Sequence, residues 1–390
     1  MLYLINATLY TPEHTVRRAA VLVMQGRIAA VGPMPLPLPP PGAAVLDAEG
    51  LLLVPGLIDL QCNGAFGDDF TAAPQTIWRV AAALPRYGIT SFLPTIISAP
   101  LSTVVAAQEV MQQGPPSGFG GAAPLGLHLE GPFLNPLKRG AHDLAWLQLP
   151  SLAAAATWHP AGGVRLVSLA PELPGAAELV SLLAGRGVLV SAAHSQASYQ
   201  QALAGFDAGI RYGTHLFNAM PPLHHRHPGL AGALLADARP VVGLIADGLH
   251  VHPALVALAW RTLGPQRLNL VSDAMAALGQ GPGRYVLGDS PVQVSNDSDA
   301  RLADGTLAGS VLALDQALRN LLAWTGCTLN EALASVTTTP AAALGLGYER
   351  GRIAPGYVAD LVLLTPDLHV HTVLAEGQVV YARSDLLRPL

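Results

Sequence analysis

The sequence is poor in charged residues and contains no run of them. Charged side chains make up 12% of its 390 residues, and the formal net charge is −5. Proteins that bind nucleic acid need clustered basic residues to neutralise phosphates, so we expect no nucleic acid as a partner. Hydrophobic residues make up 51% of the chain, which can therefore supply a large buried core.

Cysteine and long apolar runs are also scarce. Cys62 and Cys327 do not make a disulfide framework and fit a reducing cytoplasm. No apolar run reaches the roughly 18 residues that span a bilayer. The first residues lack the basic and apolar regions of a signal peptide. These absences predict a cytoplasmic protein that does not enter a membrane.

Lysine is almost absent, because Lys138 is the only lysine among 21 basic residues. Many two-metal hydrolases bridge their metals with a carboxylated lysine at a strand tip. Lys138 lies in the loop NPLKRGAH, several residues beyond the nearest predicted strand end. A site with a bridging lysine is therefore not expected.

The sequence does contain eight apolar runs of strand length, at intervals of roughly 20 to 40 residues. Helix-like stretches such as 76–88 and 252–264 fill several of the gaps. Eight such units are the number in a (β/α)8 barrel of the α/β class, and an open doubly wound sheet is the alternative. The runs are residues 56–61, 89–95, 125–130, 164–170, 188–194, 210–215, 241–248 and 268–273.

Short strand-like segments separated by turns occupy both ends of the chain, residues 1–54 and 351–390. Two such ends on either side of an α/β middle predict one small β-sandwich domain built from both termini. The barrel domain would then comprise residues 55–350.

Three residues that commonly bind metals stand at the ends of predicted strands. Glu130 ends the third run, His194 ends the fifth and His215 ends the sixth. The C-terminal ends of barrel strands share one face, so these side chains can converge. Two imidazoles and one carboxylate leave the fourth position of a zinc ion for water. A single histidine is more often a hydrogen-bonded core residue, but three such residues at strand tips favour a metal site.

Asp273 ends the eighth run, where a carboxylate can take a proton from a metal-activated water and pass it to a leaving amine. A structural aspartate that caps the next segment is the alternative. Gln61 and Asn63 follow the first run, where metal-dependent barrels often carry His-x-His. Because neutral amides are poor zinc ligands, we expect one divalent metal per chain.

Seven motifs together resemble the N-acetylglucosamine-6-phosphate deacetylases of the amidohydrolase superfamily. They are PGLIDLQCNG, HLEGPFLNPLKRGAHD, AAHSQA, GTHLFNAMPPLHHRHPGLAG, IADGLHVHP, LVSDAM and GTLAGS, in this order. The resemblance implies hydrolysis of the N-acetyl group of N-acetyl-D-glucosamine 6-phosphate to D-glucosamine 6-phosphate and acetate. It also implies a role in amino-sugar catabolism and a homodimer.

The resemblance assigns roles to individual residues. It implies that Glu130, His194 and His215 bind the metal, with zinc expected and Fe²⁺, Co²⁺ or Mn²⁺ as the other candidates. It implies that Asp273 is the general base and acid, and that His142 is a catalytic residue beside the acetamide carbonyl. The implied substrate-contacting residues are Ala141, His142, Asn218, Ala219, Arg226, His250, Leu307, Ala308 and Gly309.

With so few lysines, a phosphate would be bound by arginine, histidine and backbone N–H groups, and Arg226 and His250 fit this role. In this family the arginine can come from a partner subunit. Three other functions are the alternatives: a deacetylase of another sugar such as N-acetylgalactosamine 6-phosphate, an N-acyl-amino-acid hydrolase, and a non-catalytic scaffold. A scaffold has no need of four such groups at strand tips.

Overall fold

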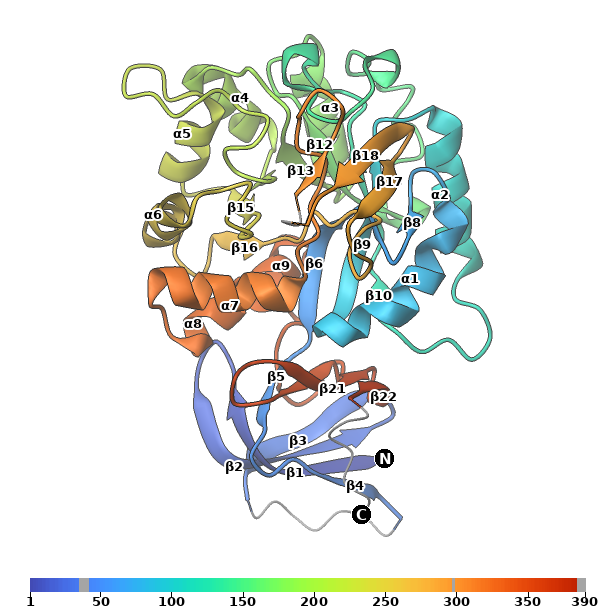
Figure 1. The fold of residues 1–390 in the computed structure, drawn as a ribbon, viewed down its shortest axis with the longest axis vertical. Coiled ribbons are helices and arrows are strands. Elements are labelled where there is room, and N and C mark those ends of the chain that lie inside the picture. Colours follow the sequence, from blue (N-terminus) through green and yellow to red (C-terminus); the bar gives the residue numbers. More distant parts are fainter. Residues whose placement is uncertain (35–41, 297–298, 384–390) are drawn as a thin grey trace.

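The structure is a computed structural model that describes residues 1–34, 42–296 and 299–383. An α/β barrel stands on a sheet built from both ends of the chain (Figure 1). Each part has its own apolar core, and Leu4, Leu53 and Leu363 lie in the core of the terminal sheet. Residues 384–390, which the sequence analysis places in the terminal domain, lie outside the described residues.

Eight parallel strands form the barrel and confirm the predicted fold class. Each coincides with one of the eight apolar runs, and nearly all of their residues are buried, as a sheet covered on both faces requires. In pairing order the strands are β6 (Leu57–Cys62), β9 (Ile89–Ile97), β11 (Leu127–Glu130), β12 (Val164–Leu169), β13 (Leu189–Ala192), β14 (Tyr212–Gly213), β15 (Val241–Leu244) and β16 (Leu268–Leu270).

Helices lie around the outside of the barrel (Figure 1). Helix α4, between the two histidine-bearing strands, begins at a capping box in which Ser198 and Gln201 bond each other's backbone N–H groups. None of the described helices is long and apolar enough to cross a membrane. The helices are α1 (Ile77–Ala83), α2 (Leu101–Gln113), α3 (Ala176–Gly185), α4 (Tyr199–Ala208), α5 (Gly229–Ala236), α6 (Pro253–Leu263), α7 (Leu314–Thr325), α8 (Leu329–Ala334) and α9 (Thr338–Ala343).

Some elements interrupt the regular alternation of strand and helix. A three-stranded antiparallel sheet lies between β16 and α7, and the sequence analysis did not predict it: β17 (Gly283–Leu287), β18 (Ser290–Val294) and β19 (Ala300–Arg301). Only 3₁₀ turns lie between β11 and β12: η3 (Pro136–Lys138), η4 (Leu144–Trp146) and η5 (Pro160–Gly162). The remaining short elements are β7 (Gly64–Ala65), β8 (Asp68–Asp69), β10 (Ala123–Pro124), η1 (Pro74–Thr76) and η2 (Leu84–Tyr87).

The terminal sheet has eight strands, and its two halves join where β5 pairs with β20 in antiparallel orientation. Leu53 of β5 lies opposite Leu363 of β20, so the first and last parts of the chain share one core. The strands are β1 (Leu2–Tyr10), β2 (Thr15–Met24), β3 (Arg27–Pro33), β4 (Ala44–Asp47), β5 (Leu52–Pro55), β20 (Leu361–Leu364), β21 (Val370–Ala375) and β22 (Gln378–Ala382).

The barrel closes through the segment that follows β16. Asp273 N donates to Gln61 O (2.9 Å), and Cys62 forms an isolated parallel bridge with Ala274. The buried carboxylate of Asp59 joins the same two segments, because its Oδ1 accepts from Ser272 N and Gln61 N, each at 3.2 Å. These bonds fix Asp273 at the end of the barrel where the strands finish.

Asp59 makes stability depend on pH. Burial raises its pKa to about 7, although bonds from Ser272 and Gln61 oppose the rise. The folded state thus holds this proton more tightly than the unfolded chain. This proton therefore stabilises the folded state. The stabilisation is fully present below pH ~4 and is lost as the pH rises through ~7.

We predict that Asp59→Asn removes this dependence, because the amide keeps an oxygen acceptor and cannot ionise. The free energy of unfolding of the variant, relative to wild type, should increase between pH ~5 and ~8 by up to a few kcal/mol. Urea unfolding of both metal-free proteins at the two pH values measures this difference. An unchanged difference would mean that Asp59 is not protonated at neutral pH.

Candidate active site

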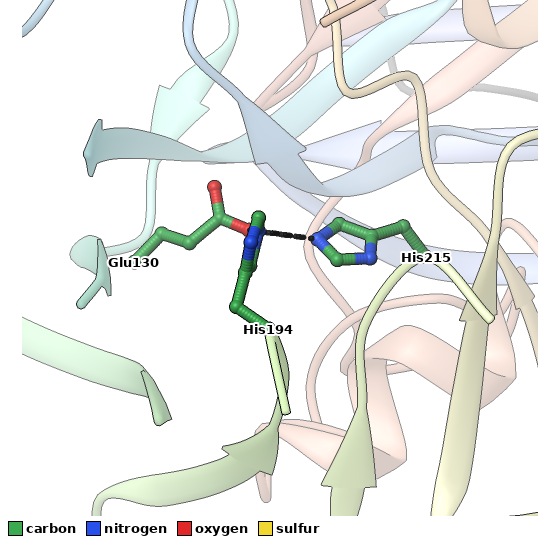
Figure 2. A group of neighbouring side chains, drawn as sticks. All are labelled: Glu130, His194 and His215. Atoms are coloured by element: carbon green, nitrogen blue, oxygen red, sulfur yellow. Dashed lines mark hydrogen bonds and ion pairs between the residues drawn. The ribbon is translucent and has the colours of Figure 1, made fainter. Parts of the chain in front are cut away.

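Glu130, His194 and His215 converge at the C-terminal ends of β11, β13 and β14 (Figure 2). His215 Nε2 lies 2.9 Å from Glu130 Oε1, and His194 Nε2 lies 3.3 Å from the same oxygen. The two imidazole Nε2 atoms are 3.1 Å apart. All three side chains are buried. The structure thus brings together the three residues that the sequence predicts as ligands.

The hydrogen bonds around this cluster test whether it fits a metal ion. His194 Nδ1 lies 2.8 Å from the carbonyl oxygen of Lys138, which can only accept, so this nitrogen carries a proton. A neutral His194 therefore directs the lone pair of Nε2 at Glu130 and His215. Electron-rich atoms this close together need a positive charge between them. Two imidazoles and a carboxylate are a donor set that suits a divalent metal.

The pKa shifts of the cluster point to the same need for positive charge. Burial alone would raise the pKa of Glu130, but hydrogen bonds with His194 and His215 hold it well below its usual range. Burial alone would lower the pKa of His215, but its bond with Glu130 raises it. The carboxyl group therefore stays ionised and draws a cation to the site.

The two histidines of the cluster and Asp273 have a left-handed backbone. The φ angles are 44° at His194, 34° at His215 and 49° at Asp273. Each residue follows its strand by two or three positions, where the chain turns at the barrel rim. Left-handed φ is unfavourable for residues other than glycine and occurs most often at functional sites. The backbone is therefore strained at the residues whose side chains point into the site.

Gln61 and Asn63 bond the carboxylates of the site. Gln61 Nε2 donates to Glu130 Oε1 (3.1 Å), and Gln61 Oε1 accepts from the hydroxyl of Thr214. Asn63 Nδ2 donates to Asp273 Oδ1 (2.7 Å). The amides at the end of β6 thus orient the two acids, and the oxygen of Gln61 is already engaged.

Asp273 is buried beside the cluster, and this position changes its acidity. Burial, followed by the negative charge of Glu130, raises the pKa of Asp273 to about 6. Asn63 occupies Oδ1, whereas Oδ2 makes no hydrogen bond within the described ranges. A carboxyl group with a pKa near neutrality and one free oxygen can both accept and return a proton.

His142 faces the cluster with a defined tautomer. Its Nδ1 accepts from the backbone N–H of Ser98 (3.2 Å) and lies 2.9 Å from the Ser98 hydroxyl. Burial lowers the pKa of His142 to about 3. The ring is therefore neutral, with its proton on Nε2, 3.8 Å from Glu130 Oε2. His142 can donate this proton in a hydrogen bond to a group bound at the cluster.

A cavity of about 450 Å³ opens above these residues. It contains most of the residues that the resemblance implies for substrate binding, but not all of them. Ala308 is fully buried beside the cavity, and Arg226 lies in an exposed loop outside its lining. The predicted residues that line the cavity are Glu130, Ala141, His142, His194, His215, Asn218, Ala219, His250, Asp273, Leu307 and Gly309.

Several lining residues were not predicted as site residues. Ile97 and Ile245 lie at or just past strand ends, so the rule that located Glu130 could have found them. Lys138 and Arg139 bring positive charge to the cavity. Nothing in the sequence of their loop indicated that these two residues would line it. Leu287 comes from the unpredicted sheet at β17.

Comparison with known proteins gives consistent matches over most of the chain. Residues 52–380 match the amidohydrolase family. The chain is 40% identical over 350 residues to N-acetylglucosamine-6-phosphate deacetylase of Homo sapiens, covering 86% of this chain and 85% of that protein. It is 39% identical over 364 residues to N-acetylgalactosamine-6-phosphate deacetylase of Escherichia coli O157:H7, covering 92% and 93%.

A solved structure extends the similarity to three dimensions. It is a mutant N-acetyl-D-glucosamine-6-phosphate deacetylase from Mycobacterium smegmatis in complex with N-acetyl-D-glucosamine-6-phosphate. The TM-score is 0.89 at 34% identity, covering 97% of this chain and 99% of that one. Sequence and structure together therefore show that this chain belongs to the amidohydrolase family, in the branch that contains the N-acetylglucosamine-6-phosphate deacetylases.

Proposed function

We propose that this chain hydrolyses the N-acetyl group of N-acetyl-D-glucosamine 6-phosphate, releasing acetate and D-glucosamine 6-phosphate. The observation that carries the proposal is the convergence of Glu130, His194 and His215 beside Asp273 in one cavity. An amide is unreactive, so its hydrolysis needs an activated water, stabilisation of the oxyanion and a proton for the amine. The residues of this cavity can provide all three.

Glu130, His194 and His215 would hold one divalent cation, with zinc the first candidate and Fe²⁺, Co²⁺ or Mn²⁺ the others. Such an ion acts as a Lewis acid that lowers the pKa of a water molecule. Gln61 and Asn63 hydrogen-bond the acids of the site, which supports a single metal position.

Asp273 and His142 would carry out the proton chemistry. Asp273 Oδ2 takes a proton from the attacking water as the new C–O bond forms. It then delivers that proton to the amine nitrogen as the C–N bond breaks. His142 donates its Nε2–H to the acetamide oxygen, where negative charge develops. Acetate and the free amine are the products.

The phosphate would be bound by His250 together with Arg226. His250 lines the cavity, whereas Arg226 lies outside the lining of its own chain. We therefore propose a homodimer in which Arg226 reaches the site of the partner subunit. Both cysteines are free, which agrees with the proposed location in the cytoplasm.

N-acetylgalactosamine 6-phosphate is the second candidate substrate, because the chain is 39% identical to an Escherichia coli enzyme named for that activity. The two sugars differ in the configuration of one hydroxyl group, at C4. The reaction would be the same, and both sugars belong in every activity assay.

Metal content is the first test. We predict about one tightly bound divalent ion per chain, because only one three-ligand cluster forms within the described residues. His194→Ala should lose both the metal and the activity, whereas His369→Ala, in the loop between β20 and β21, should lose neither. Mass spectrometry of metals on desalted protein gives the count. Two tight equivalents, lost together in Gln61→Ala, would contradict the single site.

Acetate release tests the reaction and the role of Asp273. Wild-type enzyme should release acetate from the two phosphorylated sugars faster than from N-acetylglucosamine. Asp273→Asn should keep its metal while kcat falls by a factor on the order of 10² to 10⁴. Asp207→Asn, at an exposed position, serves as the control. Absence of acetate from every sugar would reject the proposed function, and near-normal turnover in Asp273→Asn would reject its mechanism.

The Arg226 proposal predicts an effect that depends on substrate charge. Loss of a charge-assisted bond to phosphate should lower kcat/KM for the phosphorylated sugar roughly 10- to 100-fold in Arg226→Ala. The slow hydrolysis of the unphosphorylated sugar by Arg226→Ala should equal that of wild type. In the control variant, Arg79→Ala, kcat/KM for both sugars should equal that of wild type.

Mixed dimers test whether Arg226 acts across the subunit interface. Arg226→Ala chains mixed with Asp273→Asn chains should recover part of the activity, because one site then has both residues. Equal slowing of both sugars by Arg226→Ala would mean that Arg226 supports the loop or the fold instead.

A further inference from the structure

Asp247 and His250 form a buried pair in the loop that follows β15. Asp247 Oδ2 lies 2.6 Å from His250 Nδ1, and the two side chains are only 10% and 7% exposed. His250 lines the active-site cavity, and Asp247 lines a second cavity. The pair therefore contributes one residue to each of the two cavities.

The local turn fixes the carboxylate of Asp247. Its Oδ1 accepts from the backbone N–H groups of Leu249 and His250, each at 2.8 Å. Because two backbone donors hold Oδ1, the other carboxylate oxygen, Oδ2, is fixed in place against the imidazole of His250. Because this oxygen is an acceptor, the proton of the pair belongs on Nδ1 of His250. The bond with His250 is also among the interactions that lower the pKa of Asp247, against the effect of burial.

Two of the four histidines that line the cavity, His142 and His250, have opposite partners at Nδ1. His142 Nδ1 faces a backbone donor, so the neutral ring carries its proton on Nε2. His250 Nδ1 faces a carboxylate, so the neutral ring has a bare lone pair on Nε2. A bare lone pair repels a phosphate oxygen. His250 can bond a phosphate only when both of its nitrogens are protonated.

We propose that Asp247 is a positioning residue that holds the Nδ1 proton of His250, so that a substrate phosphate at Nε2 is bound by a doubly protonated ring. This inference rests on the proposed function, which assigns His250 to the phosphate. The ring would then lie between two anionic groups. The other charged groups near it are Asp273, whose charge interacts with that of His250, and the cations Lys138 and Arg139 of the cavity lining.

Asp247→Asn isolates this role, because the substitution changes the tautomer and preserves the turn. The amide oxygen can still accept from Leu249 N and His250 N, which places the NH₂ group against Nδ1. An NH₂ group donates, so Nδ1 must become the acceptor and the proton moves to Nε2. The ring keeps a donor toward the phosphate but loses its positive charge.

The first experiment measures activity on two sugars with metal-loaded enzyme. For the phosphorylated sugar, kcat/KM should fall roughly tenfold in Asp247→Asn, chiefly through KM, because a charge-assisted bond is about twice as strong as a neutral one. Hydrolysis of N-acetylglucosamine should be unchanged. Asp237→Asn is the matched control. The carboxylate of Asp237 accepts a hydrogen bond from the backbone N–H of Arg239 in a similar turn on the surface. Equal slowing of both sugars would overturn the proposal.

The second experiment measures directly which ring nitrogens of His250 carry a proton. Nitrogen-15 NMR of labelled histidine, with His250 assigned by its loss in His250→Gln, distinguishes the tautomers without any turnover. With glucosamine 6-phosphate bound, wild-type His250 should be protonated on both nitrogens, and His250 of Asp247→Asn on Nε2 alone. The same protonation in both proteins would overturn the proposal. Failure of acetate release would reject the proposed function separately, because the NMR of free enzyme still reports which nitrogen of His250 carries the proton opposite Asp247.

Discussion

The contacts around Glu130 Oε1 are the constraint on which the rest of the site depends. This oxygen accepts a hydrogen bond from Gln61 Nε2 and lies within 3.3 Å of the Nε2 atoms of His194 and His215. So many polar atoms can be buried together only if a cation balances them. The barrel provides the geometry, because β6, β11, β13 and β14 all end at the same face. The cluster thus depends on the closed barrel, and its donor set is suited to a bound cation.

Histidine chemistry in the cavity is set by what lies behind each ring. The Lys138 carbonyl accepts a hydrogen bond from His194 Nδ1 and leaves Nε2 free to bind a cation. The Ser98 N–H blocks Nδ1 of His142 and leaves its Nε2 as a donor. Asp247 accepts a hydrogen bond from His250 Nδ1 within a fixed turn. The partner behind each ring therefore suits three identical side chains to three different proposed roles: metal ligand, hydrogen-bond donor and phosphate receptor.

The sequence predicted the parts of the site that follow from strand periodicity. Glu130, His194, His215 and Asp273 were located because each stands at the end of an apolar run, and parallel strands end together. The partners behind the rings were not predictable, since the Ser98 N–H and the Lys138 carbonyl are backbone atoms present in every residue. The sheet of β17–β19 was missed because its strands are short and only partly buried.

The pairing of β5 with β20 has a consequence for how the chain is made. Leu53 leaves the ribosome early, but its partner Leu363 is synthesised only after the whole barrel. Until then β5 is an unpaired sheet edge, which invites association with other chains. Closing so large a loop is also slow. The barrel can therefore form during translation, whereas the terminal sheet can be completed only after β20 has been synthesised.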